Sequence, residues 1–562
     1  MFDVLTGLEN FAELRQNGYY YVDKTYFLNE FLFPKLSAKV ALFTRPRRFG
    51  KTLFMSMLAE FFDIRKKSRD LFAGLKVCDN EKLCNEWMNQ YPVISLTLKG
   101  LATLTYADAV TDIQNRISAL CTLHDDVLDN HKIKARDRTV FQMLMNCETN
   151  EITLRSSLLV LTRVLFQHYN KPVILLIDEY DTPVEKAFAG GYYNEMIVFM
   201  RGFLTDALKT NPYLKFGIVT GVLRITQQSL FSDLNNLDCF DISEPLYSDL
   251  FGFTQNEVDQ LLVYAGFEDK REEIKEWYDG YCFGKQQEIY CPWSIMKYLA
   301  TLKKDPKRNP AAYWVGVSGS ELPRDLAKRL PPEEDVQGKI AALRGGNAIA
   351  AKLNSDLNYV DVLKDANNFW TLLYLTGYLT RASNPALFTG EKNAKDSILA
   401  IPNKEVREVF QTEMEAWFKD ILPENRQNAL YQALWAQDVQ GLEEQLTALL
   451  VGTSFHDAKE SYYHGVMYGI LAMRYGETIS NGESGLGLYD IVVQDKKNTR
   501  AAVLEFKRAS SAEQMDEGVR QALEQINRND YDVRLRTRGC KTILHVGIAF
   551  CEKSARVGFE EA

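Results

Sequence analysis

Gly50, Lys51 and Thr52 form the segment of the sequence best suited to hold a phosphate chain. Glycine lets backbone N–H groups approach an anion, lysine can reach the terminal phosphates, and a threonine hydroxyl can hold Mg²⁺. The surrounding residues fit the P-loop pattern except at its first position, where an arginine stands in place of glycine. A basic surface turn before a helix is the alternative. The candidate nucleotide-binding residues of this loop are Arg45, Pro46, Arg47, Arg48, Phe49, Gly50, Lys51 and Thr52.

An acidic pair, Asp178 and Glu179, directly follows a continuous apolar run. This is the layout of a Walker B motif, in which Asp178 would hold Mg²⁺ and Glu179 would polarise the attacking water. A solvated acidic turn is the alternative for the pair alone. The two motifs lie on two different predicted strands. Together they favour an ATP site more strongly than either motif does alone.

Two polar residues at and after the next predicted strand could complete this site. Thr220 ends that strand, where a polar side chain could sense the γ-phosphate, and Arg224 follows it and could stabilise charge. A turn-capping threonine and a surface arginine are the alternatives.

Asp490, Glu505 and Lys507 predict a second, metal-dependent site. Glu505 and Lys507 stand two apart on a predicted strand and therefore point to one face. Asp490 and Glu505, with the Phe506 carbonyl as a further candidate ligand, would hold Mg²⁺, which lowers the pKa of a bound water. Lys507 would position or deprotonate that water, and Gln525 on the following helix could orient it. An edge strand with a solvated glutamate and lysine is the alternative.

An α/β fold is required to position these residues. The apolar run 40–43 predicts a buried strand before the phosphate loop, and helically spaced apolar residues after Thr52 predict an amphipathic helix. The continuous apolar run 172–177 predicts a central parallel strand that is covered on both faces. Further strands are expected at 91–96 and 215–222, and 105–170 and 255–450 are expected to be largely helical.

The last part of the chain predicts a separate α/β unit. Its order is helix, two strands, helix and a final strand. The expected elements are a helix at 460–474, strands at 487–493 and 501–507, a helix at 511–528 and a strand at 542–550. Glu460 and Glu483 are additional acidic candidates for its metal site.

Composition excludes several classes of protein. The 562 residues are 46% hydrophobic and carry a net charge of −9, which is a globular balance and argues against a general nucleic-acid coat. A local basic groove is compatible with this net charge, since residues 495–541 include 11 basic and 8 acidic side chains. No apolar run is long enough to span a membrane, and no secretory signal is visible. The nine cysteines are not spaced as metal ligands or as a disulfide framework would be. A cytoplasmic location is therefore expected.

Several of these segments resemble bacterial AAA-ATPase-like proteins with a C-terminal PD-(D/E)XK nuclease domain. An arginine at the first P-loop position is usual in that family. The resemblance implies ATP and Mg²⁺ as cofactors, nucleic acid, most naturally DNA, as the partner of the C-terminal domain, and ring-like homo-oligomers as an option. The matching segments are Tyr21–Thr25, Thr44–Thr52, Ile177–Asp181, Thr220–Val222, Trp277–Tyr281, Pro292–Ser294, Leu375–Leu379 and Asn481–Asp490.

The resemblance also implies three domains. They are an AAA-like P-loop ATPase core over 1–255, a helical lid over 256–400, and a restriction-endonuclease-like nuclease domain over 401–562. Family members usually carry arginine at the positions of Leu486 and Leu488, so two phosphate-attracting side chains are lost here. Three functions therefore stay open. The first is an ATPase coupled to an active nuclease, and the second is an ATP-driven switch whose nuclease-like domain only binds nucleic acid or a protein. The third is a scaffold that binds ATP without hydrolysing it. His464 also matches the family pattern, with a helix-packing histidine as the alternative.

Overall fold

The structure is a computed structural model. It describes residues 6–32, 38–101, 104–224, 236–314, 336–354, 357, 359–388, 393–421, 424–451, 467, 471, 477–484, 487–495 and 499–562. Within this part of the chain, no helix has the length and apolar character needed to cross a membrane.

A five-stranded parallel sheet forms the centre of the N-terminal region. Its order is β2-β3-β4-β1-β5, and every neighbouring pair is parallel. All residues of β3 are buried, which confirms the predicted central strand. The sequence did not predict β5. The strands are β1 (Val40–Thr44), β2 (Val93–Thr97), β3 (Val173–Asp178), β4 (Leu214–Gly221) and β5 (Leu237–Phe240).

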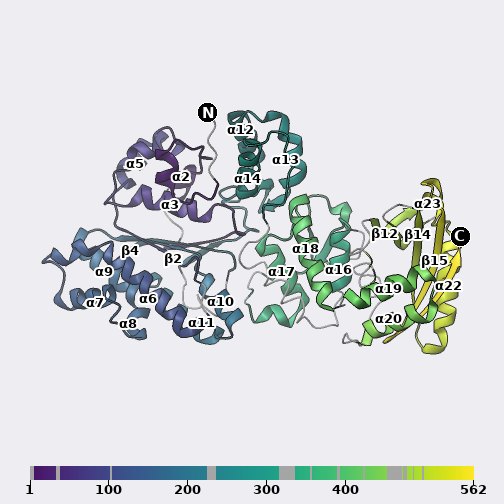
Figure 1. Ribbon diagram of the computed structural model, residues 1–562. Coiled ribbons are helices and arrows are strands. Elements are labelled where there is room, and N and C mark those ends of the chain that lie inside the picture. Colours follow the sequence, from purple (N-terminus) through teal and green to yellow (C-terminus); the bar gives the residue numbers. More distant parts are fainter. Residues whose placement is uncertain are drawn as a thin grey trace.

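Helices cover both faces of this sheet. Figure 1 shows α2, α3 and α5 on one side and α6, α7, α9 and α11 on the other. This two-sided cover explains why β3 is apolar along its whole length. The helices of this region are α1 (Phe11–Gln16), α2 (Tyr26–Leu32), α3 (Lys51–Phe62), α4 (Arg69–Phe72), α5 (Glu81–Trp87), α6 (Tyr106–Thr122), α7 (Ala135–Met145), α8 (Glu151–Arg155), α9 (Ser157–Tyr169), α10 (Thr182–Gly190) and α11 (Tyr193–Leu208).

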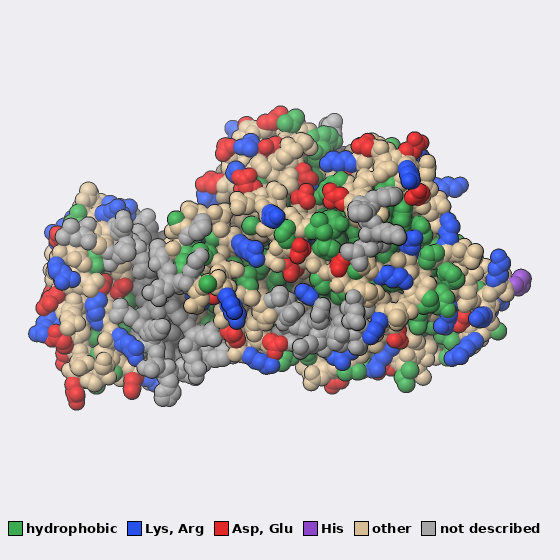
Figure 2. Space-filling model, turned by 180° about the vertical axis from the view of Figure 1, so that it is seen from behind, with side chains coloured by type: hydrophobic (Ala, Val, Ile, Leu, Met, Phe, Trp, Pro, Cys, Tyr) green, Lys and Arg blue, Asp and Glu red, His purple; other side chains and the backbone are tan. Residues whose placement is uncertain are grey.

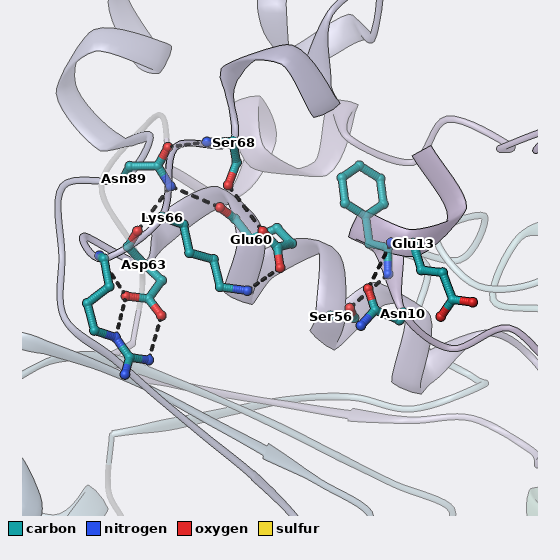
Figure 3. Close-up of polar contacts among 10 residues, drawn as sticks. Asn10, Glu13, Ser56, Glu60, Asp63, Lys66, Ser68 and Asn89 are labelled. Atoms are coloured by element: carbon teal, nitrogen blue, oxygen red, sulfur yellow. Dashed lines mark hydrogen bonds and ion pairs between the residues drawn. The ribbon is translucent and has the colours of Figure 1, made fainter. Parts of the chain in front are cut away.

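Helix α3, which follows the phosphate loop, is fixed along its length by polar contacts (Figure 3). Ser56 Oγ accepts a hydrogen bond from the Phe11 N–H at 2.9 Å, which ties α1 to α3. Near its end, the Glu60 carboxylate accepts from Ser68 Oγ at 3.1 Å, and Asn89 Nδ2 donates to the Glu60 and Asp63 carbonyls at 3.1 and 3.0 Å. These contacts tie the middle and the C-terminal end of α3 to α1 and to the segments that carry Ser68 and Asn89.

The middle of the chain is mostly helical, as predicted, but it also contains two small sheets that the sequence did not predict. Their orders are β6-β8-β7 and β10-β11-β9. The helices are α12 (Gln255–Ala265), α13 (Arg271–Tyr278), α14 (Pro292–Leu302), α16 (Val336–Arg344), α17 (Ala366–Thr376), α18 (Lys404–Ile421), α19 (Glu424–Ala436) and α20 (Val439–Val451). The strands are β6 (Phe253–Thr254), β7 (Tyr281–Phe283), β8 (Gln286–Tyr290), β9 (Ile349–Ala351), β10 (Thr380–Arg381) and β11 (Ser397–Ala400).

The C-terminal sheet has the order β12-β13-β14-β15-β16, in which only β14 and β15 are parallel. Alternate residues of β14 separate two apolar clusters. Leu504 and Phe506 pack with residues of α19 and α20, whereas Val503 packs with residues of α22 and α23. The elements are β12 (Glu477–Ser484), β13 (Gly487–Gln494), β14 (Arg500–Arg508), α22 (Met515–Arg528), α23 (Val533–Thr537), β15 (Thr542–Cys551) and β16 (Ser554–Glu561).

Two details of this region differ from the sequence prediction. The predicted final strand is followed by β16, and β12 lies in a segment for which the sequence predicted no strand. Most of the predicted helix at 460–474 lies outside the described residues.

Candidate nucleotide site and candidate metal centre

The phosphate loop connects the end of β1 to the start of α3. Gly50 caps α3 with a φ of 88°, a left-handed conformation that glycine adopts without strain. The buried Lys51 Nζ donates to the Arg45 and Pro46 carbonyls, both at 2.9 Å. Burial lowers the pKa of Lys51, and the carboxylates of Glu179 and Asp178 oppose that shift. The lysine is thus folded back onto its own loop.

Asp178 lies between two hydroxyl groups at the carboxyl edge of the sheet. Thr52 Oγ1 donates to Asp178 Oδ2 at 2.8 Å, and Thr220 Oγ1 donates to Asp178 Oδ1. The three residues come from α3, β3 and β4, because the register brings the ends of β1, β3 and β4 together. A hydroxyl beside a carboxylate is a donor set that suits Mg²⁺, so these residues fit the metal predicted there.

Glu179 follows β3 in an uncommon backbone conformation, with a φ of 54°. Such conformations in non-glycine residues carry strain and are enriched at functional sites. Burial raises the pKa of Glu179, and the nearby ammonium of Lys51 opposes that shift. Glu179 lines the same cavity as Lys51 and Thr52, and Asp178 is joined to these residues through its hydrogen bond from Thr52.

The cavity has a volume of about 710 Å³ and extends from the phosphate loop toward the N-terminal segment and α14. This volume lies in the range of small-molecule sites, roughly 300–1,000 Å³. Its lining combines charged and polar side chains, among them Lys51, Thr52 and Glu179, with apolar ones such as Trp293 and Met296. A ligand with a charged chain and an apolar ring system suits this mixed lining.

The second site lies on the α22 side of the C-terminal sheet. Ile491 pairs with Leu504, so Asp490 and Glu505 are adjacent in the register of β13 and β14. Asp490 Oδ2 accepts from the Phe506 N–H at 2.8 Å, which fixes the first carboxylate against the second strand.

Glu505 has contrasting surroundings at its two carboxylate oxygens. Oε1 accepts from Lys507 Nζ at 3.0 Å and from Gln525 Nε2. Oε2 is buried and has no hydrogen-bond partner among the residues that the structure describes. Burial, with Asp490 as the next cause, raises the pKa of Glu505 to about 7. A divalent cation beside Asp490 would satisfy the orphaned oxygen, so the residues present fit Mg²⁺.

Further candidate residues were predicted for this metal centre. Among the described residues, no group of three or more His, Cys, Asp or Glu side chains could hold a metal ion. Glu460, His464 and Leu486 lie outside the described residues, as do the side chains of Glu483 and Leu488.

Comparison with known proteins assigns both regions to families. Residues 5–231 match the family model described as a predicted AAA-ATPase, and residues 458–560 match the PD-(D/E)XK nuclease superfamily. The chain therefore joins an AAA-ATPase-like region to a C-terminal region of the PD-(D/E)XK nuclease superfamily. It is also 27% identical over 571 residues to a protein of Azotobacter chroococcum mcd 1 that is described as an uncharacterized protein in the vnfD 5' region; the match covers 98% of this chain and 97% of that protein.

Arg45 of the AAA-ATPase-like region points away from the phosphate site, unlike the other charged residues of its loop. Its buried guanidinium donates to the carbonyls of Thr44, Phe240 and Tyr247 at 2.9, 2.7 and 3.0 Å. Burial lowers its pKa to about 10. The arginine in place of the first P-loop glycine therefore anchors the loop to the segment after β5.

The remaining loop residues lie at different parts of the site. Arg47, Arg48 and Phe49 line the cavity, whereas Pro46 packs against Gly377 of the middle region. Arg224 follows β4 and is not among the described residues that line the cavity.

Tyr180 and Asp181 are functional candidates that reasoning from single residues missed. Asp181 Oδ2 accepts from the N–H groups of Val222 and Leu223 at 2.8 and 2.9 Å, and Tyr180 Oη donates to the Leu223 carbonyl at 2.7 Å. A Cβ at Gly221 would lie 2.6 Å from the Tyr180 ring, so glycine is required there. These contacts hold the segment that carries Thr220. The signals in the sequence were their place directly after the acidic pair and the resemblance of Ile177–Asp181 to the family.

The nuclease domain has no continuous basic coat on the face shown in Figure 2, where Lys and Arg side chains alternate with Asp and Glu. The basic residues around α23 include Arg534, Arg536 and Arg538. Arg536 is engaged by Asp532, with Nη2 to Oδ2 at 2.6 Å.

Proposed function

We propose that this chain binds and hydrolyses ATP with Mg²⁺ at the phosphate loop, and that its nucleotide state controls a Mg²⁺-dependent phosphodiesterase in the C-terminal domain that acts on nucleic acid. The observation that carries the proposal is the hydrogen bond from the Thr52 hydroxyl to Asp178, because Thr52 also lines a cavity of about 710 Å³. The two family matches supply the general ATPase and nuclease architecture.

In the ATPase step, Thr52 and Asp178 would hold Mg²⁺, which neutralises charge on the phosphates when bound. Lys51 would exchange its two loop carbonyls for the terminal phosphates, which are better acceptors for an ammonium. Glu179 would orient the attacking water and accept its proton, since a carboxylate with a raised pKa is a stronger base near neutral pH.

In the nuclease step, Asp490 and Glu505 would hold Mg²⁺, which supplies an activated water and stabilises charge on the phosphate when bound. Lys507 would orient that water, since its Nζ lies 3.0 Å from Glu505 Oε1. Gln525 would keep the Glu505 carboxylate in place from α22. We favour DNA as the substrate.

A chain of contacts between the phosphate loop and α18 supports the proposed control. The Arg48 guanidinium lies 3.9 Å from the centre of the Trp293 ring, and Trp293 Nε1 donates to the Tyr313 carbonyl at 3.0 Å. The N–H groups of Tyr313 and Trp314 donate to Glu405 Oε1 at 2.7 and 3.0 Å. Glu405 lies in the first turn of α18, so a change at the loop has a packed route to that helix.

From α18 the chain leads through α19 to α20, which packs on the nuclease sheet (Figure 1). Glu443 of α20 accepts from the Val557 N–H at 3.0 Å and pairs with Arg556 at 3.1 Å, both in β16. A shift of α18 could thus be passed to the sheet that carries Asp490 and Glu505.

The decisive experiment is plasmid cleavage by the purified chain in Mg²⁺, with and without ATP, together with phosphate release. We expect cleavage that disappears in Glu505→Ala and an ATP effect that disappears in Lys51→Ala. Glu513→Ala, an exposed glutamate of the same domain, is the matched control and should cleave normally. Phosphate release without cleavage in any condition would instead support the switch with an inactive nuclease-like domain.

A further inference from the structure

Lys99 lies beside the Walker B pair, although it belongs to neither phosphate motif. It follows β2, whose last residue, Thr97, pairs with Asp178 at the carboxyl edge of the sheet. Lys99 lines the same cavity as Lys51 and Glu179. Burial raises the pKa of Glu179, and the nearby ammonium groups of Lys51 and Lys99 oppose that shift.

The partner of Lys99 is a carboxylate from the N-terminal segment. Its Nζ forms an ion pair with Glu9 Oε1, and the two side chains are 43% and 49% exposed. Ion pairs this exposed contribute little to stability. Glu9 also lines the cavity, so the pair stands at its rim and can open toward a ligand.

Two other cations that line the cavity, Arg47 and Lys24, are held by more buried partners. Arg47 Nη2 pairs with Glu185 at 2.5 Å, and the Glu185 side chain is only 9% exposed. Lys24 Nζ donates to the Asp249 carbonyl at 2.7 Å and to Glu257. Releasing either cation would leave a buried acceptor without its donor, whereas Glu9 can be hydrated when it loses Lys99.

We propose that Lys99 contacts the terminal phosphate of ATP, exchanging Glu9 for the γ-phosphate and so distinguishing ATP from ADP. The inference rests on the proposed nucleotide site. A triphosphate extends one charged group further than a diphosphate, and an ammonium two residues beyond the strand next to Asp178 is placed to meet that group. The exchange would release Glu9 and the segment that leads into α1, which packs on α3.

The test is equilibrium titration of the full-length chain, with Mg²⁺, against the β,γ-imido analogue of ATP and against ADP. Lys99→Ala should weaken binding of the analogue by about tenfold, as expected for a lost charge-assisted hydrogen bond, and change ADP binding by less than about twofold. Lys99→Arg should retain most of the preference. Glu9→Gln should strengthen analogue binding, because it removes the competing carboxylate.

Two controls make the outcomes distinct. Lys132→Ala changes an exposed lysine that does not line the cavity and should bind both nucleotides normally. Lys186→Ala changes a lysine that does line it, from α10. Loss of discrimination in Lys186→Ala but not in Lys99→Ala would overturn the assignment. Equal weakening of both nucleotides in Lys99→Ala would also overturn it while the proposed function stands; wild-type protein that binds neither nucleotide would overturn both.

Discussion

The two candidate sites are built from similar residues but differ in how far the protein completes them. At the N-terminal site, each oxygen of Asp178 accepts a hydrogen bond from a threonine hydroxyl. At the C-terminal site, Glu505 has two donors on Oε1, one of them the Lys507 ammonium, and a buried Oε2 with no partner among the described residues. The first arrangement is satisfied by the protein's own side chains. The second leaves one carboxylate oxygen without a donor from the described part of the chain, so its geometry and charge should depend much more on a bound cation.

The largest effect that separates the sites is expected from Glu179→Gln. The amide keeps the shape of the side chain but cannot accept a proton, and general-base catalysis contributes about 10²–10⁴-fold. ATP hydrolysis should fall by that factor, measured as phosphate release. ATP binding and ATP-independent plasmid cleavage should persist, since neither needs the base.

Glu185→Gln is a useful comparison, because it changes a neighbouring acid of α10 that pairs with Arg47. Glu185→Gln should weaken ATP binding more than it lowers the rate of ATP hydrolysis. If Glu179→Gln hydrolysed ATP at the wild-type rate, the assignment of Glu179 as the base would be abandoned.

A second test asks whether the N-terminal site is organised by the protein itself, through Arg45. Arg45→Met keeps a long side chain but leaves three buried carbonyls without their donor. Each buried acceptor left without its donor costs about 1–3 kcal/mol, so the free energy of unfolding should fall by at least about 2 kcal/mol. Urea denaturation measures the change.

Arg48→Met is the matched control in the same loop. Its guanidinium stacks on Trp293 at 3.9 Å, a half-exposed contact worth about 0.5–2 kcal/mol. Equal destabilisation by both variants would contradict the anchoring role of Arg45.

The sequence was informative where chemistry and local pattern coincide. Lys51, Thr52 and Asp178 could be predicted because a strand, a loop and a helix follow one another around them. The direction of Arg45 could not, because its acceptors Phe240 and Tyr247 are distant in the sequence and come close only in the folded chain.

The missed strands have physical reasons of their own. Strand β12 reads Glu-Thr-Ile-Ser-Asn-Gly-Glu-Ser and is too polar to show an alternating pattern. Strand β16 is an edge strand with mixed charge, and β5 has only four residues. Pairing with a neighbour, rather than local preference, forms these strands.

The third test addresses the incomplete site through pH and Mg²⁺. The pKa of Glu505 is raised by burial to about 7 in the folded chain, above its ordinary value of 4.5. The folded state therefore binds more protons than the unfolded state between these values, and stability should fall as pH rises through this range, by up to about 1.4 kcal/mol per pH unit. Above pH 7, bound Mg²⁺ should restore the stability that is lost.

Melting temperatures measured from pH 5 to pH 8, with and without Mg²⁺, check this prediction. Glu505→Gln cannot ionise, so it should flatten the pH dependence and remove the stabilisation by Mg²⁺. Asp178→Asn should change neither the pH dependence of stability that Glu505 causes nor the stabilisation of the C-terminal domain by Mg²⁺. A Mg²⁺ effect that survives Glu505→Gln would show that the cation binds elsewhere.

The smallest effect is expected between the sites, at Glu405. Glu405→Ala removes the acceptor of the Tyr313 and Trp314 N–H groups, while Glu405→Gln keeps an oxygen there. The ATP-dependent change in cleavage should shrink on the order of threefold to tenfold in the alanine variant and persist in the glutamine variant. Phosphate release and basal cleavage should stay near wild type in both, because Glu405 belongs to neither site.

Glu408→Ala, an exposed position one turn along α18, is the control. If it reduced the ATP effect as much as Glu405→Ala, general loosening of α18 would explain the result better than the contact chain.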